Sequence, residues 1–123
     1  MVKGIGVDII EIQRMQESIE RSGERFLERI FTKHEIEYCK SKQNASQHFA
    51  ARFAAKEAVG KALSTGLRGK FSWKDIEVVN DELGKPNIQL HGSLQETLKT
   101  MSILLSISHS NHSVVAMAVI EER

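Results

Sequence analysis

The sequence predicts an α+β fold in which helices pack on a mainly antiparallel sheet. Two observations favour this class. Strand-like segments occur near both ends of the chain, and the long stretch after the first of them has helical periodicity. The later strand-like segments come in pairs separated by short connections, an order that favours antiparallel pairing of neighbours. We therefore expect residues 1–123 to form one domain of this class.

Composition limits the classes of protein to which the chain can belong. Its 123 residues are 41% hydrophobic and 27% charged, and 17 Lys+Arg against 16 Asp+Glu give a formal net charge of +1. So small a net charge argues against a protein that mainly covers nucleic acid. Cys39 is the only cysteine, which excludes an internal disulfide and a thiolate-rich zinc site. With no leader pattern and no apolar run near the roughly 18 residues of a membrane span, we expect a soluble, cytoplasmic protein.

The first strand and the first helix are predicted from different patterns of apolar residues. Val2 to Ile10 is an apolar, β-branched run typical of a buried strand, although Asp8 interrupts it. From Ile12 to Arg21 the apolar residues recur at spacings of three and four, as they do on one face of a helix. A strand that is followed at once by a helix is consistent with the α+β class.

The next two helices are recognised by their ends. Thr32 followed by Glu35 is a capping box, which predicts a short helix through about Lys42. The longest helix is expected from about Ala45 to Ser64, and the glycines of the segment 66–69 end it. Its apolar and small residues surround the helix, so we expect it to be buried on several sides.

The second half of the chain predicts two hairpins with a helix between them. The first hairpin has strands at Trp73 to Asn80 and at Asn87 to Leu90. A helix from Ser93 to about Met101 follows, opened by a second capping box. The last two strands are expected at Ile103 to Ser108 and at Ser113 to Ile120.

Charged residues on the long helix are the first candidates for chemistry. Arg52, Lys56, Glu57 and Lys61 interrupt an apolar surface, and a buried charge is costly unless it is paired or binds a ligand. Glu57 and Lys61 are four residues apart, so a simple surface ion pair is one interpretation. Asp8 favours another, because strand alternation puts it on the face opposite Val7 and Ile9.

If that face of the strand points at the long helix, Asp8 and Glu57 converge. Two carboxylates without a cysteine or histidine cluster are a ligand set for a hard cation, and Mg²⁺ commonly binds one or two carboxylates plus phosphate oxygens and water. With Lys61 one turn from Glu57, such a site would bind a diphosphate through metal and ammonium together. The sequence alone leaves the convergence open.

Four blocks, in order along essentially the whole chain, closely resemble the holo-[acyl-carrier-protein] synthase family, the small bacterial 4′-phosphopantetheinyl transferases. The blocks are Gly4-Ile5-Gly6-Val7-Asp8-Ile9, Arg52-Phe53-Ala54-Ala55-Lys56-Glu57-Ala58 followed by Lys61-Ala62, Asn80-Asp81-Glu82-Leu83-Gly84-Lys85-Pro86, and Ser106-Ile107-Ser108-His109-Ser110. The resemblance implies transfer of the 4′-phosphopantetheine group of coenzyme A (CoA) to a serine of apo acyl carrier protein. The products would be holo acyl carrier protein and adenosine 3′,5′-bisphosphate, in support of fatty acid biosynthesis.

The resemblance also implies roles for single residues. Asp8 and Glu57 match the family's ligands for Mg²⁺, and Lys61 matches a lysine that contacts the CoA phosphates. His109 matches a histidine beside the nucleotide, and Gly84-Lys85-Pro86 resembles a loop that binds the nucleotide end of CoA. Glu57, directly or through a metal-bound water, is our first candidate for the base that takes the serine proton. His109 is the alternative base, or a residue that contacts the nucleotide without proton transfer.

The implied protein partner is acidic, so a basic face is expected on the enzyme. Arg14 and Arg21 are seven residues apart, which places them on one face of the first helix, and Arg25 follows just beyond it. In the family this helix binds the carrier protein, and Phe26 is a candidate apolar contact. The family forms homotrimers with active sites between subunits. The small and apolar residues of this chain fit a trimer and a monomeric core equally well.

Two positions depart from the family pattern, and two other functions stay open. Ser113 replaces a frequent aromatic residue near the nucleotide, and Ser64 replaces a glycine that usually begins the loop after the long helix. One alternative function is a non-catalytic binding module for an acidic protein, with Asp8 and Glu57 in structural ion pairs. The other is a different Mg²⁺-dependent enzyme that acts on a diphosphate, although the sequence has no P-loop motif.

Overall fold

The computed structural model describes residues 1–64 and 71–123, with the side chain of Ser64 left out. Ten elements follow one another along these residues. They are β1 (Val2–Glu11), α1 (Ile12–Ile30), α2 (Lys33–Lys40), α3 (Ala45–Ser64), the 3-10 helix η1 (Trp73–Asp75), β2 (Ile76–Asn80), β3 (Pro86–Leu90), α4 (Ser93–Thr97), β4 (Met101–His109) and β5 (Ser113–Glu122). The α+β class predicted from the sequence is confirmed, with two antiparallel sheets in place of one.

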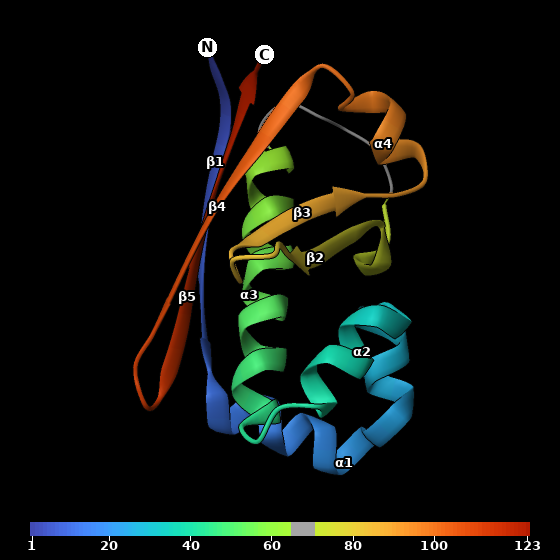
Figure 1. Ribbon diagram of the computed structural model, residues 1–123, viewed down its shortest axis with the longest axis vertical. Helices are drawn as coiled ribbons and strands as arrows, with labels where there is room; N and C mark the ends of the chain where they lie inside the picture. Colours follow the sequence, from blue (N-terminus) through green and yellow to red (C-terminus); the bar gives the residue numbers. More distant parts are fainter. Residues whose placement is uncertain (65–70) are drawn as a thin grey trace.

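The larger sheet has the strand order β1-β5-β4, and every neighbouring pair is antiparallel. All the helices lie on one side of this sheet, and α3 runs along its inner face (Figure 1). The smaller sheet is the hairpin of β2 and β3, which lies in front of α3 in the same view. The long helix is therefore enclosed by the large sheet, the hairpin and the two N-terminal helices, as its apolar circumference predicted.

Small residues let β1 approach α3 closely. Gly6 faces the helix, and a Cβ atom there would lie 2.0 Å from the carbonyl oxygen of Ala58 and 2.8 Å from the amide nitrogen of Ala62. On the central strand, Ala116 and Ala118 are likewise fully buried. Strand and helix backbones can pack at this distance only where side chains are small, which explains the alanines on α3 and the glycine on β1.

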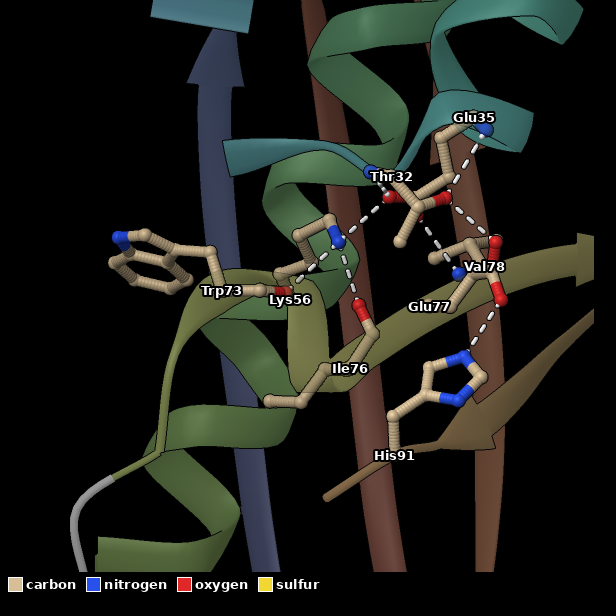
Figure 2. Close-up of polar contacts among 8 residues, drawn as sticks. All are labelled: Thr32, Glu35, Lys56, Trp73, Ile76, Glu77, Val78 and His91. Atoms are coloured by element: carbon tan, nitrogen blue, oxygen red, sulfur yellow. Dashed lines mark hydrogen bonds and ion pairs between the residues drawn. The ribbon is translucent and has the colours of Figure 1, made fainter. Parts of the chain in front are cut away.

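A fully buried ion pair joins α3 to α2 and to the hairpin (Figure 2). The Nζ atom of Lys56 lies 2.7 Å from Oε1 of Glu35 and donates hydrogen bonds to the carbonyl oxygens of Trp73 and Ile76. The second oxygen of Glu35 accepts a hydrogen bond from the Val78 amide at 2.8 Å. Since each polar atom has a partner, this pair fixes the rotation of α3 about its axis and so the direction of its other side chains.

The N-terminal helices match the predicted patterns with one difference. The Thr32 hydroxyl and the Glu35 carboxylate form the predicted capping box at the start of α2. The first helix continues well past Arg21 to Ile30, and Gly23 interrupts it with φ 56° and ψ −139°. The two parts of α1 on either side of Gly23 therefore have different directions.

Several boundaries in the second half differ from the expectation. Residues Trp73–Asp75 form a 3-10 turn instead of the start of a strand, because the Asp75 carboxylate accepts a hydrogen bond from the Ser72 amide. The helix α4 ends at Thr97, and it begins after Gly92, whose φ is 64°, without a side-chain cap. The predicted helix end at the glycines of 66–69 lies outside the described residues. No helix in the described part of the chain is long and apolar enough to cross a membrane.

Candidate active site

Asp8 on β1 and Lys61 on α3 form the first part of the candidate site. The Nζ atom of Lys61 lies 3.0 Å from Oδ1 of Asp8 and also donates a hydrogen bond to the Val7 carbonyl oxygen at 3.0 Å. The Asp8 side chain is 16% exposed, although Val7 and Ile9 point to solvent on the opposite face of the strand. Strand alternation puts Asp8 on the face opposite Val7 and Ile9, as the sequence predicted, and the contact with Lys61 shows that this face points toward α3.

Glu57 completes this group, which we call the carboxylate cluster (Asp8, Glu57 and Lys61). It lies one helical turn before Lys61 and is half-buried. Burial raises the pKa of Glu57 above its ordinary value, the negative charge of Asp8 raises it further, and the charge of Lys61 opposes the rise. Because Lys61 contacts Asp8 and lies four residues after Glu57 on the same face of α3, the two carboxylates lie on the same side of the helix. A carboxylate with a raised pKa is also a better proton acceptor.

One oxygen of the carboxylate cluster has the properties of a cation ligand. Oδ2 of Asp8 is buried and has no hydrogen-bond partner among residues 1–64 and 71–123. A buried oxygen without a donor is unfavourable, and a divalent cation would compensate it. The described residues contain no group of three or more His, Cys, Asp or Glu side chains that could hold a metal. Asp8 and Glu57 fit a hard cation such as Mg²⁺, which takes its other ligands from water and phosphate.

His109 lies elsewhere, at the end of β4 and beside the start of α3. Its Nε2 atom is 3.3 Å from Nε2 of Gln47, and its Nδ1 atom is 3.4 Å from the carbonyl oxygen of Ser110. With the proton on Nδ1, Nε2 accepts a hydrogen bond from the Gln47 amide. His109 therefore contacts the N-terminal end of α3, whereas the carboxylate cluster lies toward the other end.

Positive charge is concentrated near His109. The Arg52 guanidinium lies 4.1 Å from the centre of the Tyr38 ring, and the Lys42 ammonium lies 4.8 Å from the same centre. Burial lowers the pKa of His48, and the charges of Arg52, Lys42 and His109 lower it further. Such a group attracts anions. We call Lys42, His48, Arg52 and His109 the basic cluster.

The loop Gly84-Lys85-Pro86 is joined to the basic cluster. Asp81 closes the turn, because its Oδ1 atom accepts a hydrogen bond from the Lys85 amide at 2.8 Å. Gly84 has φ 86°, a conformation that favours glycine. Asn80 connects this turn to Arg52 through a hydrogen bond of 2.6 Å. Two of the predicted nucleotide contacts therefore lie near the first half of α3: His109 contacts Gln47, and the loop is connected to Arg52 through Asn80.

The two clusters do not meet within one chain. Gln47, the partner of His109, precedes Glu57 by ten residues, which corresponds to about 15 Å along a helix. Arg52 and Glu57 are five residues apart, so their side chains leave α3 in directions that differ by about 140°. The structure thus brings Asp8, Glu57 and Lys61 together, and it brings His109 and the 84–86 loop to a different side of the same helix.

The predicted partner-binding residues lie on α1. Arg14, Arg21 and Arg25 are exposed, and Phe26 is half-buried. A groove of about 580 Å³ lies between this helix and the large sheet. Its lining residues are Ile9, Ile10, Glu11, Arg14, Met15, Ser18, Phe26, Phe53 and Ser113. Arg14 and Phe26 come from opposite sides of the Gly23 kink and meet at this one groove.

Comparison with known proteins gives the same family as the sequence blocks. A family model described as the 4′-phosphopantetheinyl transferase superfamily matches residues 4–118. The holo-[acyl-carrier-protein] synthase of Geobacter sp. (strain M21) is 48% identical over 124 residues, covering 98% of this chain and 99% of that protein. The chain belongs to the holo-[acyl-carrier-protein] synthase family.

Solved structures of this family have the same fold. The holo-[acyl-carrier-protein] synthase of Neisseria meningitidis is 34% identical and superimposes with a TM-score of 0.89 over 99% of this chain and 100% of its own. The synthase of Bacillus anthracis, crystallised in complex with CoA (3′,5′-ADP), is 38% identical with a TM-score of 0.83, over 100% of this chain and 99% of its own.

The two departures from the family pattern have different outcomes. The Ser113 amide donates a hydrogen bond to Oγ of Ser110 at 3.2 Å, and the Ser110 amide donates to the Ser113 carbonyl oxygen at 2.9 Å. Ser113 thus closes the turn between β4 and β5 without an aromatic ring. The side chain of Ser64 and the loop after it lie outside the described residues.

Sequence reasoning did not identify most of the basic cluster. In the sequence Arg52 stands out only as a charge on an apolar helix, and His48 lies one turn before it on the same side. That spacing of an arginine and a histidine is the signal that could have indicated an anion site. Lys42 lies between two helices, and nothing in its sequence context indicated that it would contact the Tyr38 ring.

Proposed function

We propose that this chain transfers the 4′-phosphopantetheine group of CoA to a serine of apo acyl carrier protein, in support of fatty acid biosynthesis. The products are holo acyl carrier protein and adenosine 3′,5′-bisphosphate. The convergence of Asp8, Glu57 and Lys61 is the observation that carries the proposal. The family resemblance implies these three residues, and Asp8 and Lys61 are in contact although they are 53 positions apart in the sequence. Membership of the family over residues 4–118 supports it.

In this proposal Asp8 and Glu57 hold Mg²⁺, and Lys61 binds a phosphate oxygen of the diphosphate. The buried, unpartnered Oδ2 atom of Asp8 supports the assignment. When bound, Mg²⁺ supplies Lewis-acid stabilisation of the charge that develops on the phosphoryl oxygens. The ammonium of Lys61, already directed toward Asp8 at 3.0 Å, stabilises the same charge from the helix side.

The reaction is a displacement at phosphorus. The serine oxygen of the carrier protein forms a bond to the β-phosphorus of CoA, and the bond from that phosphorus to the bridging oxygen breaks. The electron pair of the broken bond leaves with adenosine 3′,5′-bisphosphate. Glu57 accepts the serine proton, directly or through water. His109 remains the alternative base or a nucleotide contact.

The nucleotide half of CoA is assigned to the basic cluster and to Gly84-Lys85-Pro86. Arg52 supports this, because its side chain is buried and its Nε atom has no hydrogen-bond partner among the described residues. An unpartnered guanidinium nitrogen among cationic groups is suited to a phosphate oxygen. The Lys85 side chain and the backbone amides of the exposed turn provide further donors for a phosphate.

Within one chain the carboxylate cluster and the basic cluster do not lie side by side. This favours an active site between subunits of a homotrimer. An apolar patch on the outer face of the large sheet supports such an assembly, since none of the described helices covers that face (Figure 1). Its exposed residues are Val2, Ile5, Val7, Ile9, Leu104, Val115 and Met117. Cross-strand register places Val7 beside Met117 and Ile9 beside Val115, so the side chains form one continuous surface. A patch of this kind indicates an interaction site.

Carrier protein binding is assigned to the exposed face of α1 with Arg14, Arg21, Arg25 and Phe26. The arginines would attract an acidic partner helix, and binding should weaken steeply with ionic strength. The proposed location is the cytoplasm, consistent with Cys39, which is a free, buried thiol. Burial raises the pKa of this thiol to about 12, so it is unreactive at neutral pH.

Intact mass measurement tests the proposed function. The chain is incubated with CoA, Mg²⁺ and apo acyl carrier protein, and the carrier protein should gain the mass of one phosphopantetheine group. Chelation of the metal, Asp8→Asn and Glu57→Gln should each abolish the gain, whereas Glu82→Gln, a change in the exposed turn, should keep it. Binding of the carrier protein without a mass gain would favour a binding module. Breakdown of CoA without modification of the carrier protein would favour a hydrolase.

A further inference from the structure

We propose that Asn80 is a positioning residue for CoA binding, which fixes the Gly84-Lys85-Pro86 turn to α3 through both ends of its side-chain amide. The inference rests on the proposed function, in which this turn binds the nucleotide end of CoA. Asn80 itself is not assigned a contact with CoA. Its role is to keep the turn and the basic cluster at a constant relative position before the substrate arrives.

Both ends of the Asn80 amide are used. The Oδ1 atom accepts a hydrogen bond of 2.6 Å from Nη2 of Arg52, and the Nδ2 atom donates one of 2.9 Å to the carbonyl oxygen of Gly84. An amide has an acceptor end and a donor end, so only one orientation of the side chain satisfies a guanidinium on one side and a carbonyl on the other. Asn80 is therefore oriented by its partners.

The α3 end of this connection is rigid. Arg52 is 4% exposed, and its guanidinium lies 4.1 Å from the centre of the Tyr38 ring. A planar guanidinium held between an aromatic ring and an amide has little freedom. The same helix is fixed by the buried pair of Lys56 and Glu35 (Figure 2). Asn80 thus connects the turn to a helix that is anchored by a buried ion pair.

The other end of the connection is an exposed turn that needs such an anchor. Asp81 determines the internal shape of the turn, since its carboxylate accepts hydrogen bonds from the amides of Leu83 and Lys85. These contacts lie within the turn and do not determine how it is oriented relative to α3. Leu83 at its tip is 95% exposed. The bond from Asn80 to Gly84 connects the far side of the turn to a buried group, and a preorganised turn binds its ligand with a smaller entropy loss.

Two substitutions separate the two ends of the amide. Asn80→Ala removes both hydrogen bonds. Asn80→Asp keeps an oxygen for Arg52 but replaces the donor to Gly84 with a second acceptor. If the turn must be anchored, both variants should raise the KM for CoA by about tenfold, the equivalent of one hydrogen bond of about 1.4 kcal/mol. The kcat at saturating CoA and the KM for the carrier protein should stay within about twofold of the wild-type values.

A matched variant controls for the added charge of Asn80→Asp, which could repel the CoA phosphates. Asn87 is exposed on β3 beside Pro86, and its side-chain amide donates a long hydrogen bond of 3.4 Å to the Lys85 carbonyl oxygen. Asn87→Asp therefore adds the same charge next to the same loop without breaking the connection to α3. Its KM for CoA should change by less than about twofold, because an exposed charge is screened by solvent.

The outcomes distinguish this inference from the proposed function. Steady-state kinetics of the wild type and the three variants are measured by the mass gain of the carrier protein. A wild-type KM for CoA in Asn80→Asp would overturn the inference, because the bond to Gly84 would then be unnecessary. An equal rise in Asn87→Asp, or a fall in kcat with an unchanged KM, would also overturn it. If the wild type transfers no phosphopantetheine, the proposed function fails and the inference fails with it.

Discussion

Gly6 and Asp8 lie on the same face of β1, and both depend on the close approach of α3. Gly6 has no side chain, so the strand backbone packs directly against Ala58 and Ala62. Two residues later the same face presents Asp8, whose Oδ1 atom is 3.0 Å from the Lys61 ammonium. The spacing Gly-x-Asp on β1 therefore has a physical reason: the glycine sets the distance at which the aspartate can contact the helix.

We predict that Gly6→Ala destabilises the protein and reduces its activity together. The new Cβ would lie 2.0 Å from the Ala58 carbonyl oxygen, a backbone atom that cannot move without displacing α3. Overpacking of a core costs about 1–3 kcal/mol, which should lower the melting temperature by several degrees. The displacement should also separate Asp8 from Glu57 and Lys61, so transfer activity should fall even well below the melting temperature.

Gly60→Ala is the control for this prediction. Gly60 lies on α3, and its Cβ would be 3.6 Å from the Phe71 side chain, an ordinary contact. Alanine is favoured over glycine inside a helix by about 1 kcal/mol, so this variant should be as stable as the wild type or more so. Thermal unfolding and the transfer assay compare the two variants. An unchanged melting temperature in Gly6→Ala would contradict the predicted close packing.

The first helix has no net charge, so its basic face depends on geometry. Residues 12–30 contain four arginines (Arg14, Arg21, Arg25 and Arg29) and four glutamates (Glu17, Glu20, Glu24 and Glu28). Seven helical residues are close to two turns, which aligns Arg14 with Arg21. Beyond Gly23 the backbone changes direction, so the kink determines where Arg25 and Phe26 lie relative to the first two arginines.

We predict that Gly23→Ala weakens carrier protein binding selectively. A Cβ atom at this position would meet nothing within 4 Å, so the glycine is required by its backbone angles of φ 56° and ψ −139° and not by packing. Alanine disfavours this conformation and favours a continuous helix, which would move Arg25 and Phe26 relative to Arg14. The KM for the carrier protein should rise several-fold, while the KM for CoA should not change.

Ser22→Ala serves as the comparison, because Ser22 is exposed on the same helix next to the kink. Both Michaelis constants are measured well below the melting temperature of each variant. If Gly23→Ala lowers only the melting temperature, the kink is a feature of folding alone. A rise in the KM for CoA of the same size would indicate a general loss of structure instead of a change in the docking helix.

The kink also illustrates which features the sequence could and could not predict. Asp8 was predictable as a site residue because a carboxylate in an apolar strand needs a partner, and the capping box of α2 was predictable because it is local. The second part of α1 was not predicted, because the expected helix ended at Arg21, although apolar residues resume helical spacing after Gly23 at Phe26 and Ile30. Contacts between distant segments, such as the bond between Arg52 and Asn80, have no local pattern.

In the proposed function the molecule has two half-sites, and the described residues leave one apolar sheet face exposed. The carboxylate cluster and the basic cluster use different sides and different ends of α3, so a single CoA molecule that contacts both would have to do so across two chains. The exposed apolar patch on the large sheet provides a surface on which chains can associate. A small domain gains from this arrangement, because an interface can form a deeper binding site than a chain of 123 residues provides alone.

We predict that two inactive variants, one in each half-site, restore activity when their chains assemble together. Glu57→Gln should inactivate the carboxylate cluster and His109→Ala the basic cluster, yet a site that takes each half from the other variant is intact. A purified trimer that contains both variants has chains in a 2:1 ratio, so about one of its three sites should be intact. Co-expression with two tags, purification of the mixed trimers and the transfer assay measure this. Mixing Asp8→Asn with Glu57→Gln is the control, because both changes lie in the same half-site and no activity should return. Mixed trimers of the first pair that remain inactive would show that the site is built within one chain.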